Sequence, residues 1–146
     1  MRVVVQRVKE ASCIVNERVV SSIKHGFMLL VGFSCEDTIN NVEKMAKKIS
    51  SLRIFDDENG KINLNIHDAG GEILSISQFT LYADTKKSNR PSFSASMPGE
   101  QAKVLYEYFN SLLEEKYQLS VQPGVFGAHM YLDIICDGPV TITLEE

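Results

Sequence analysis

The sequence predicts an α+β fold, a mainly antiparallel sheet or partial β-barrel with two amphipathic helices packed on it. Apolar runs of strand length outnumber the two windows in which apolar residues recur every three or four positions, and many links between strands are short enough for hairpins. The 146 residues are 44% hydrophobic and 23% charged, which is typical of one ordinary domain. We therefore expect a single domain over residues 1–146, in the order strands, helix, strands, helix, strands.

The first 33 residues carry strand patterns. Residues 3–5 begin a first strand, and residues 13–15 and 19–23 flank a predicted hairpin turn at residues 16–18. Residues 27–31 form a continuous apolar run of buried-strand length. The period then changes, because apolar residues at steps of three or four over residues 39–52 predict an amphipathic helix, with Asp37 or Thr38 as its cap.

Strand patterns return at residues 53–55 and 62–64, on either side of an acidic turn at residues 56–60 that we interpret as a solvated hairpin tip. Residues 73–76 predict another buried strand. Residues 98–116 predict the second helix, with Pro98 in its first turn. Two alternating strands end the chain, and Gly138-Pro139 is expected to be a turn between them.

Charge and cysteine content exclude several classes of protein. Fifteen Lys and Arg against nineteen Asp and Glu give a net charge of −4, which argues against a general nucleic-acid coating protein but not against a nucleic-acid substrate held at one spot. Cys13, Cys35 and Cys136 are odd in number and form no CxxC pair, so we expect reduced, buried thiols. His25, His67 and His129 have no metal-ligand spacing, and the first two are expected to be exposed. We expect no metal and no cofactor.

The sequence contains no leader-like apolar region and no apolar run of the roughly 20 residues that a membrane span needs. We therefore expect a cytoplasmic protein that does not enter a membrane. It also contains no GxGxxG, GxxxxGK[ST] or GxSxG motif, so neither a nucleotide cradle nor an α/β-hydrolase is indicated.

Three local stretches could carry chemistry. Residues 77–83 place Ser, Gln and Thr at the end of a buried strand, where they are either site residues or hydrogen-bonding residues of the strand end. Residues 85–93 carry a charge of +3 and form either a phosphate-binding loop or an ordinary solvated loop. Residues 136–141 contain Gly138-Pro139, for which the general statistics of X-Pro bonds favour the trans isomer. Glycine there would also let main chain approach a ligand closely.

Taken together, these stretches resemble the D-aminoacyl-tRNA deacylases over essentially the whole chain. The resemblance rests on M-R-V-V-V-Q-R-V at the start, L-R-I-F-x-D-x-x-G-K-x-N-L from position 52, S-Q-F-T-L-Y-A-D-T from 77, R-P-S-F from 90, F-G-A-x-M from 126 and D-G-P-V-T from 137. Cys136 departs from an Asn that many members carry. Ser88-Asn89 departs from a common Gly and basic residue, and this weakens the case for phosphate contacts by the loop.

The resemblance implies a homodimeric enzyme that hydrolyses the ester between a D-amino acid, or glycine, and the 3′-terminal adenosine of tRNA. It implies catalytic-site positions at Ser77, Gln78, Phe79 and Thr80, and a Gly-cisPro motif at Gly138 and Pro139, held by Arg7 and donated across the interface to reject L-amino acids. Gly127, Ala128 and Met130 would lie near the adenosine pocket, and Lys86, Lys87 and Arg90 would contact phosphates.

Two mechanisms and two other interpretations remain open from the residues alone. Thr80 is the nucleophile that its position suggests, but no His or carboxylate near it in the sequence could serve as its base. We favour oxyanion stabilisation by backbone amides near Phe79 and Thr80, with the ribose 2′-hydroxyl helping to activate water. A non-enzymatic binding module could use the same pocket, and a trans Gly138-Pro139 turn would indicate a relative with relaxed chirality.

Overall fold

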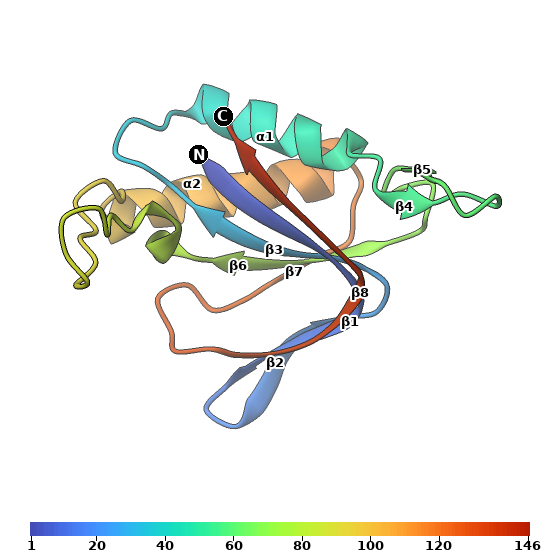
Figure 1. Ribbon diagram of the computed structural model, residues 1–146, viewed down its shortest axis with the longest axis horizontal. Coiled ribbons are helices and arrows are strands. Elements are labelled where there is room, and N and C mark those ends of the chain that lie inside the picture. Colours follow the sequence, from blue (N-terminus) through green and yellow to red (C-terminus); the bar gives the residue numbers. More distant parts are fainter.

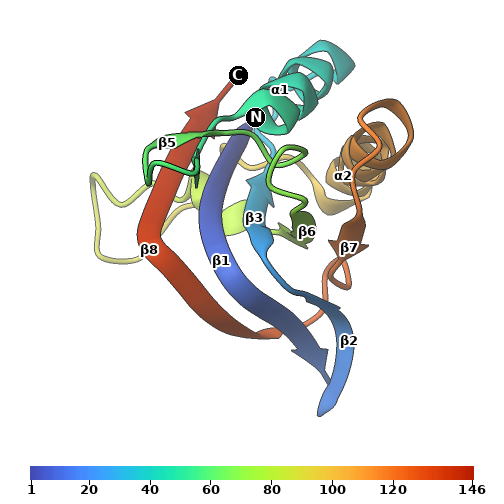
Figure 2. The same ribbon diagram turned by 90° about the vertical axis from the view of Figure 1, so that its right-hand side faces the viewer.

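The computed structural model describes all residues 1–146 and has the predicted α+β architecture, a strongly curved, barrel-like sheet with two helices on one face (Figures 1 and 2). The sheet order is β2-β1-β3-β6-β7, with β8 paired to the other side of β1. The strand bounds are β1 Arg2–Val15, β2 Arg18–Ile23, β3 Gly26–Gly32, β6 Glu72–Ser77, β7 Val121–Pro123 and β8 Tyr131–Glu145.

The long strand β1 organises the sheet by changing partners along its length. Its first half pairs with β3 and its second half with β2, whereas β8 runs antiparallel along both halves. Figure 1 shows β1 and β8 curving together from the helix layer around to the other face. The sheet is mixed, because β3, β6 and β7 are mutually parallel while β2, β1, β3 and β8 pair antiparallel.

The helices α1 (Ile39–Ser51) and α2 (Gly99–Ser111) cover one face of the sheet, and α2 continues into a π turn at Leu112–Lys116. Val42, Met45, Ala46 and Ile49 are fully buried, so the predicted spacing of α1 is its core-facing stripe. Thr38, rather than Asp37, is the N-cap, and its backbone amide donates to Asn41 Oδ1 at 2.9 Å. Pro98 is the N-cap of α2, directly before its first turn.

Two hydrophobic cores lie on the two faces of the sheet. The larger one fills the space between the sheet and the helices and includes Phe27, Ile73 and Phe109. The smaller one is enclosed by the curl of β1, β2 and β8 and includes Cys13, Met28 and Ile76. Neither helix is long and apolar enough to cross a membrane.

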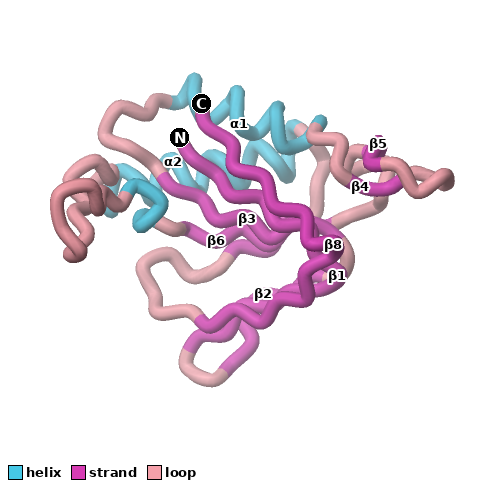
Figure 3. The backbone as a smooth tube through the Cα atoms, viewed as in Figure 1, coloured by secondary structure: helices cyan, strands magenta, loops and turns pink.

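A small hairpin and a 3₁₀ turn project from opposite ends of the molecule (Figure 3). The hairpin β4 (Phe55–Asp56) and β5 (Ile62–Leu64) carries the exposed acidic tip that the sequence predicts. The 3₁₀ turn η1 (Phe79–Tyr82) follows β6 directly. The predicted turn between β1 and β2 is also confirmed, since Asn16 and Glu17 have φ angles of 49° and 63°.

The predicted turn at Gly138-Pro139 is wrong, because β8 is one strand that passes through these residues. Between the Val8–Cys136 and Gln6–Thr141 pairs β1 has one residue, Arg7, whereas β8 has residues 137–140. The extra residues form a wide bulge, since proline has no N–H to offer the ladder. The Gly138-Pro139 peptide bond is cis, as the resemblance implies and against the general preference for trans.

The expectation of three buried thiols is correct for Cys13 only. Cys35 lies in the exposed turn before α1, and Cys136 lies beside the bulge of β8, where its side chain is exposed. Burial raises the pKa of the Cys13 thiol, because the thiolate would lose its hydration in the apolar core. His25 and His67 are exposed, as expected.

Candidate active site

A cavity of about 570 Å³ opens where β3 and β6 end, beside the first turn of α2. Its walls come from the ends of both strands, η1, the first turn of α2 and residues 126–132. They are mainly apolar, and they include Phe33, Ile76, Met97 and Ala102. A mostly apolar cavity of this size with a few polar groups is typical of a small-molecule or cofactor site.

Ser77, Gln78 and Phe79 line this cavity, so the first predicted stretch is at the site. β6 is buried up to Ser77, and the Gln78 amide donates to the Val31 carbonyl at 2.7 Å, which fixes the main chain as it leaves the sheet. A Cβ on Gly32 would lie 2.7 Å from the Gln78 carbonyl oxygen, so this close approach of main chain requires glycine. A rigid strand end therefore positions these residues.

Thr80 occupies a different environment from its three neighbours. It is exposed on η1 and is not among the residues that line the cavity. Its carbonyl accepts from the Ala83 amide at 3.1 Å and closes the 3₁₀ turn. The backbone of Phe79 and Thr80, rather than the threonine side chain, is therefore what this turn fixes beside the cavity.

Gly127, Ala128 and Met130 line the opposite wall, together with Phe126 and His129. The Ala128 amide donates to the Val125 carbonyl at 3.1 Å, and Gly127 has φ +76°, so a tight turn brings this segment back over the cavity. The structure thus unites the predicted adenosine-side residues with Ser77, Gln78 and Phe79.

His129 lines the cavity as well, although the sequence did not predict it there. It is the only ionisable side chain among the residues that line the cavity, and its ring packs edge-on against Tyr131 with centroids 5.0 Å apart. The spacing of the three histidines does not indicate this, because spacing in a sequence can suggest shared metal ligands but not a single residue on a cavity wall. Its place within the F-G-A-x-M stretch could have identified it.

Lys86, Lys87 and Arg90 are exposed on the loop between η1 and α2. The base of the loop is closed by two hydrogen bonds between Asp84 and Ser92, of 2.8 and 2.9 Å. Phe93, just beyond, lines the cavity and packs edge-on against Phe79 at 5.0 Å. The loop is therefore attached at the cavity mouth, although none of its three cations lines the cavity.

Arg7, Gly138 and Pro139 lie elsewhere in the chain. None of them lines the cavity. Arg7 pairs with Phe27 on β3, and Phe27 lies four residues, or about 13 Å of strand, from the cavity residue Val31.

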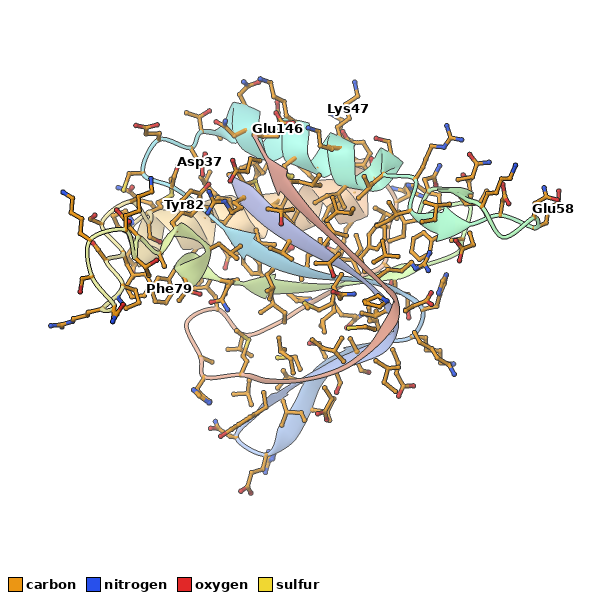
Figure 4. All side chains as sticks on the ribbon, in the orientation of Figure 1. Asp37, Lys47, Glu58, Phe79, Tyr82 and Glu146 are labelled. Atoms are coloured by element: carbon orange, nitrogen blue, oxygen red, sulfur yellow. The ribbon has the colours of Figure 1, made fainter.

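Arg7 is only 5% exposed and attaches the bulge of β8 to the β4 hairpin. Its guanidinium donates to the carbonyls of Asp137 and Ile54, at 3.2 and 2.8 Å, and pairs with the carboxylates of Asp137 and Asp56 at 3.1 and 3.4 Å. Figure 4 shows Phe79 and Tyr82 toward one end of the molecule and Glu58 at the tip of the hairpin at the other end.

Comparison with known proteins identifies the family of this chain. The model of the family described as D-Tyr-tRNA(Tyr) deacylase matches residues 4–145. A D-aminoacyl-tRNA deacylase of Brevibacillus brevis is 55% identical over 146 residues, which is all of both chains. One of Thermotoga petrophila is 50% identical over all of this chain and 97% of its own.

Two solved structures have the same fold. The first, titled c-Myc DNA Unwinding Element Binding Protein, is 44% identical with a TM-score of 0.95, and the match covers 100% of this chain and 99% of that one. The second, titled as a probable eukaryotic D-amino acid tRNA deacylase, is 16% identical with a TM-score of 0.88 over 99% and 98% of the two chains, and it supports the fold alone. On the family model and the full-length relatives, this chain belongs to the D-aminoacyl-tRNA deacylases, a family of tRNA-editing hydrolases.

Proposed function

We propose that this deacylase removes D-amino acids, and also glycine, from the 3′-terminal adenosine of tRNA, and that it rejects L-amino acids with the main chain of Gly138-Pro139. The observation that carries the proposal is the single cavity that unites Ser77, Gln78 and Phe79 with Gly127, Ala128 and Met130. In this proposal the reaction takes place in the cytoplasm, where charged tRNA is used.

The cavity suits the end of an aminoacylated tRNA. Its volume of about 570 Å³ is in the range that buries a ligand of nucleoside size. Phe126 and Met130 offer apolar contact to adenine, and Phe79, which is 56% exposed at the mouth, offers a stacking surface. The cations of Lys86, Lys87 and Arg90 would meet the phosphates that lead to the terminal nucleotide.

Chirality needs a rigid surface beside the α-carbon. A main-chain edge leaves room for hydrogen but not for a side chain on one side of that carbon, and steric exclusion discriminates more strongly than one missing contact. Glycine has no side chain to exclude, so this filter admits it. The carbonyls of the edge would also accept hydrogen bonds from the α-ammonium group.

The edge would come from a second copy of the chain. Gly138 and Pro139 are exposed and lie outside the cavity of their own chain, while Arg7 holds the bulge in place from behind. A two-fold dimer in which each bulge enters the partner's cavity would complete two equivalent sites. The exposure of Gly138 and Pro139 outside their own cavity is what supports the homodimer that the resemblance implies.

Hydrolysis would depend on the substrate and on backbone amides more than on a protein base. The amides near Phe79 and Thr80 belong to a fixed 3₁₀ turn and could stabilise the oxyanion. The exposed Thr80 hydroxyl lies off the cavity wall, so the ribose 2′-hydroxyl is the better placed group to activate water.

A deacylation assay with paired D- and L-aminoacyl-tRNA tests the function. We expect release of the D-amino acid and of glycine, with the L-ester intact. Ala128→Trp should abolish release, because the indole fills the cavity, whereas Val125→Trp, which is exposed and outside the wall, should not. Equal release of the L-amino acid, or tight binding without turnover, would contradict the proposal.

The mechanism is tested by comparing Thr80→Ala with a substrate whose terminal adenosine lacks the 2′-hydroxyl. We expect Thr80→Ala to retain activity within about tenfold and the deoxy substrate to react roughly 10²-fold or more slowly, the size of one such catalytic contribution. A loss of about 10⁴ with Thr80→Ala and none with the deoxy substrate would instead make the threonine the nucleophile.

His129→Gln completes this comparison, since His129 is the one ionisable side chain of the cavity. In the proposed mechanism His129 is not the general base, so we expect activity to fall by no more than about tenfold. Removal of a general base would instead lower activity roughly 10²–10⁴-fold. A larger loss that depends on pH would assign the base to His129.

A further inference from the structure

We infer that Tyr106, which does not line the cavity, is a positioning residue that holds the adenosine-side wall in its binding conformation. The inference rests on the proposed function, because it assigns to that wall the binding of the tRNA end. It concerns the segment 124–130, which connects β7 to β8 and carries five of the lining residues.

The Tyr106 hydroxyl is a polar group buried between α2 and the sheet. Tyr106 is 3% exposed between α2 and the sheet, in the same core cluster as Phe109 and Ile73. Its hydroxyl donates to the Ser75 carbonyl at 2.7 Å, and burial raises its pKa. Phenylalanine would fill this place equally well and would bury no hydroxyl, so packing alone does not explain the tyrosine.

The Ser75 carbonyl also holds the first residue of the segment 124–130. Ser75 is opposite Pro123 in the parallel pairing of β6 and β7, and proline has no N–H. The next amide, that of Gly124, donates to the Ser75 carbonyl at 2.8 Å. The tyrosine hydroxyl and the first amide of the segment therefore share one acceptor.

Further contacts connect Tyr106 to the rest of the wall. Its ring packs against Phe126, which lines the cavity, with centroids 5.7 Å apart. A Cβ on Gly124 would lie 2.8 Å from the Met130 sulfur, so both ends of the segment are closely packed there. Ala102, one turn before Tyr106 on α2, lines the cavity as well.

These contacts explain how a residue outside the cavity controls its shape. Ser75 precedes Ser77 by two residues on β6, so the acceptor is part of the strand that positions the other wall. Tyr106 thus fixes the position of the segment 124–130 relative to the end of β6. Loss of its hydroxyl should loosen the segment without removing any group that contacts the substrate.

Tyr106→Phe tests the inference in the full-length protein. We expect amide hydrogen exchange in residues 124–130 to become several-fold faster. We expect KM for D-aminoacyl-tRNA to rise about threefold to tenfold, the change that one ordinary hydrogen bond produces, with kcat within about twofold. A purely structural role would lower thermal stability and leave both the amide exchange of residues 124–130 and KM unchanged.

Two control variants separate positioning from stability. Tyr108→Phe removes an exposed hydroxyl on the same helix, which donates to Glu43 at 2.9 Å, and should change neither measurement. Val42→Ala, in the core side of α1, should destabilise the fold more than Tyr106→Phe and still leave KM unchanged.

The outcomes are distinguishable. If wild type deacylates D-aminoacyl-tRNA but Tyr106→Phe changes neither exchange in residues 124–130 nor KM, the inference is wrong and the proposed function stands. If Val42→Ala raises KM as much as Tyr106→Phe, the effect is one of stability and the inference is also wrong. If exchange increases as expected but wild type releases no D-amino acid, Tyr106 still holds the segment and the proposed function fails.

Discussion

Tyr82, at the end of η1, is the ionisable side chain near the site with the largest change in proton affinity. Burial raises its pKa to about 12, and the negative charge of Asp37 acts in the same direction. The guanidinium of Arg2 lies over its ring, 4.9 Å from the centroid. The phenol is therefore kept neutral at pH values at which an exposed tyrosine ionises.

This environment predicts a loss of stability at high pH. The folded-state pKa exceeds the unfolded value, so the contribution of Tyr82 is complete below pH 10 and is lost as the pH rises from 10 to about 12. Tyr82→Phe should lack this component. Urea unfolding of both proteins across this range should show the free energy of unfolding falling more steeply for wild type, and parallel curves would contradict the assignment.

Individual site residues were predictable to the extent that their neighbours in sequence are also their neighbours in space. Ser77, Gln78 and Phe79 leave one strand end together, and the F-G-A-x-M stretch lines the cavity from a single short segment that begins with a turn. Thr80 belongs to the same motif, but it is exposed on the 3₁₀ turn and does not line the cavity, and a motif carries no information about which residues of a turn line a cavity.

Among the elements, the pairing of β3 with β6 depends on a glycine at its start. A Cβ on Gly26 would lie 1.9 Å from the Glu72 carbonyl oxygen and 2.6 Å from the Glu72 amide nitrogen. Both contacts are with main chain, so no change of rotamer could relieve them. The two strands, which lead directly to the cavity, would have to separate.

Gly26→Ala should therefore reduce the free energy of unfolding by roughly 3–5 kcal/mol, at the upper end of what single substitutions do. Gly99→Ala is the matched control, because a Cβ there meets nothing within 4 Å, and it should stay within about 0.5 kcal/mol of wild type. Denaturant unfolding measures both changes. Similar values for the two variants would show that the β3–β6 contact can relax.

The helices were the most predictable elements and β8 the least. The spacing of apolar residues determines which face of α1 is buried, and this is a local property. The alternation in β8 is interrupted at Gly138-Pro139, which locally resembles a turn. Continuity comes from β1, which pairs with β8 on both sides of the bulge through Val8–Cys136 and Gln6–Thr141, residues far apart in the chain. The parallel pairing of β3 and β6 also joins segments separated by the whole of α1 and the β4–β5 hairpin.

For the molecule as a whole, a net charge of −4 and a basic loop at the cavity mouth imply a weak grip on the tRNA backbone. Lys86, Lys87 and Arg90 could neutralise three phosphates, which predicts a slope of about −2 in a plot of log binding constant against log salt concentration. Replacing all three with alanine should bring the slope close to zero. A much steeper slope in wild type, or an unchanged slope in the triple variant, would show that other cations hold the tRNA.

The separation of Gly138-Pro139 from the cavity of its own chain has a genetic consequence. If each site combines the cavity of one subunit with the bulge of the other, two variants that are each inactive can regain activity when they form mixed dimers. Gly138→Val, which adds a side chain that would crowd Val140, damages only the donated edge, and Ala128→Trp damages only the cavity. Random mixing makes half of the dimers mixed, each with one intact site of two, so about a quarter of the wild-type activity should return. By the same counting, a dimer of wild type with either variant keeps one intact site of two, so activity in a cell that expresses both alleles should simply follow the share of healthy chains, and neither defective allele should be dominant.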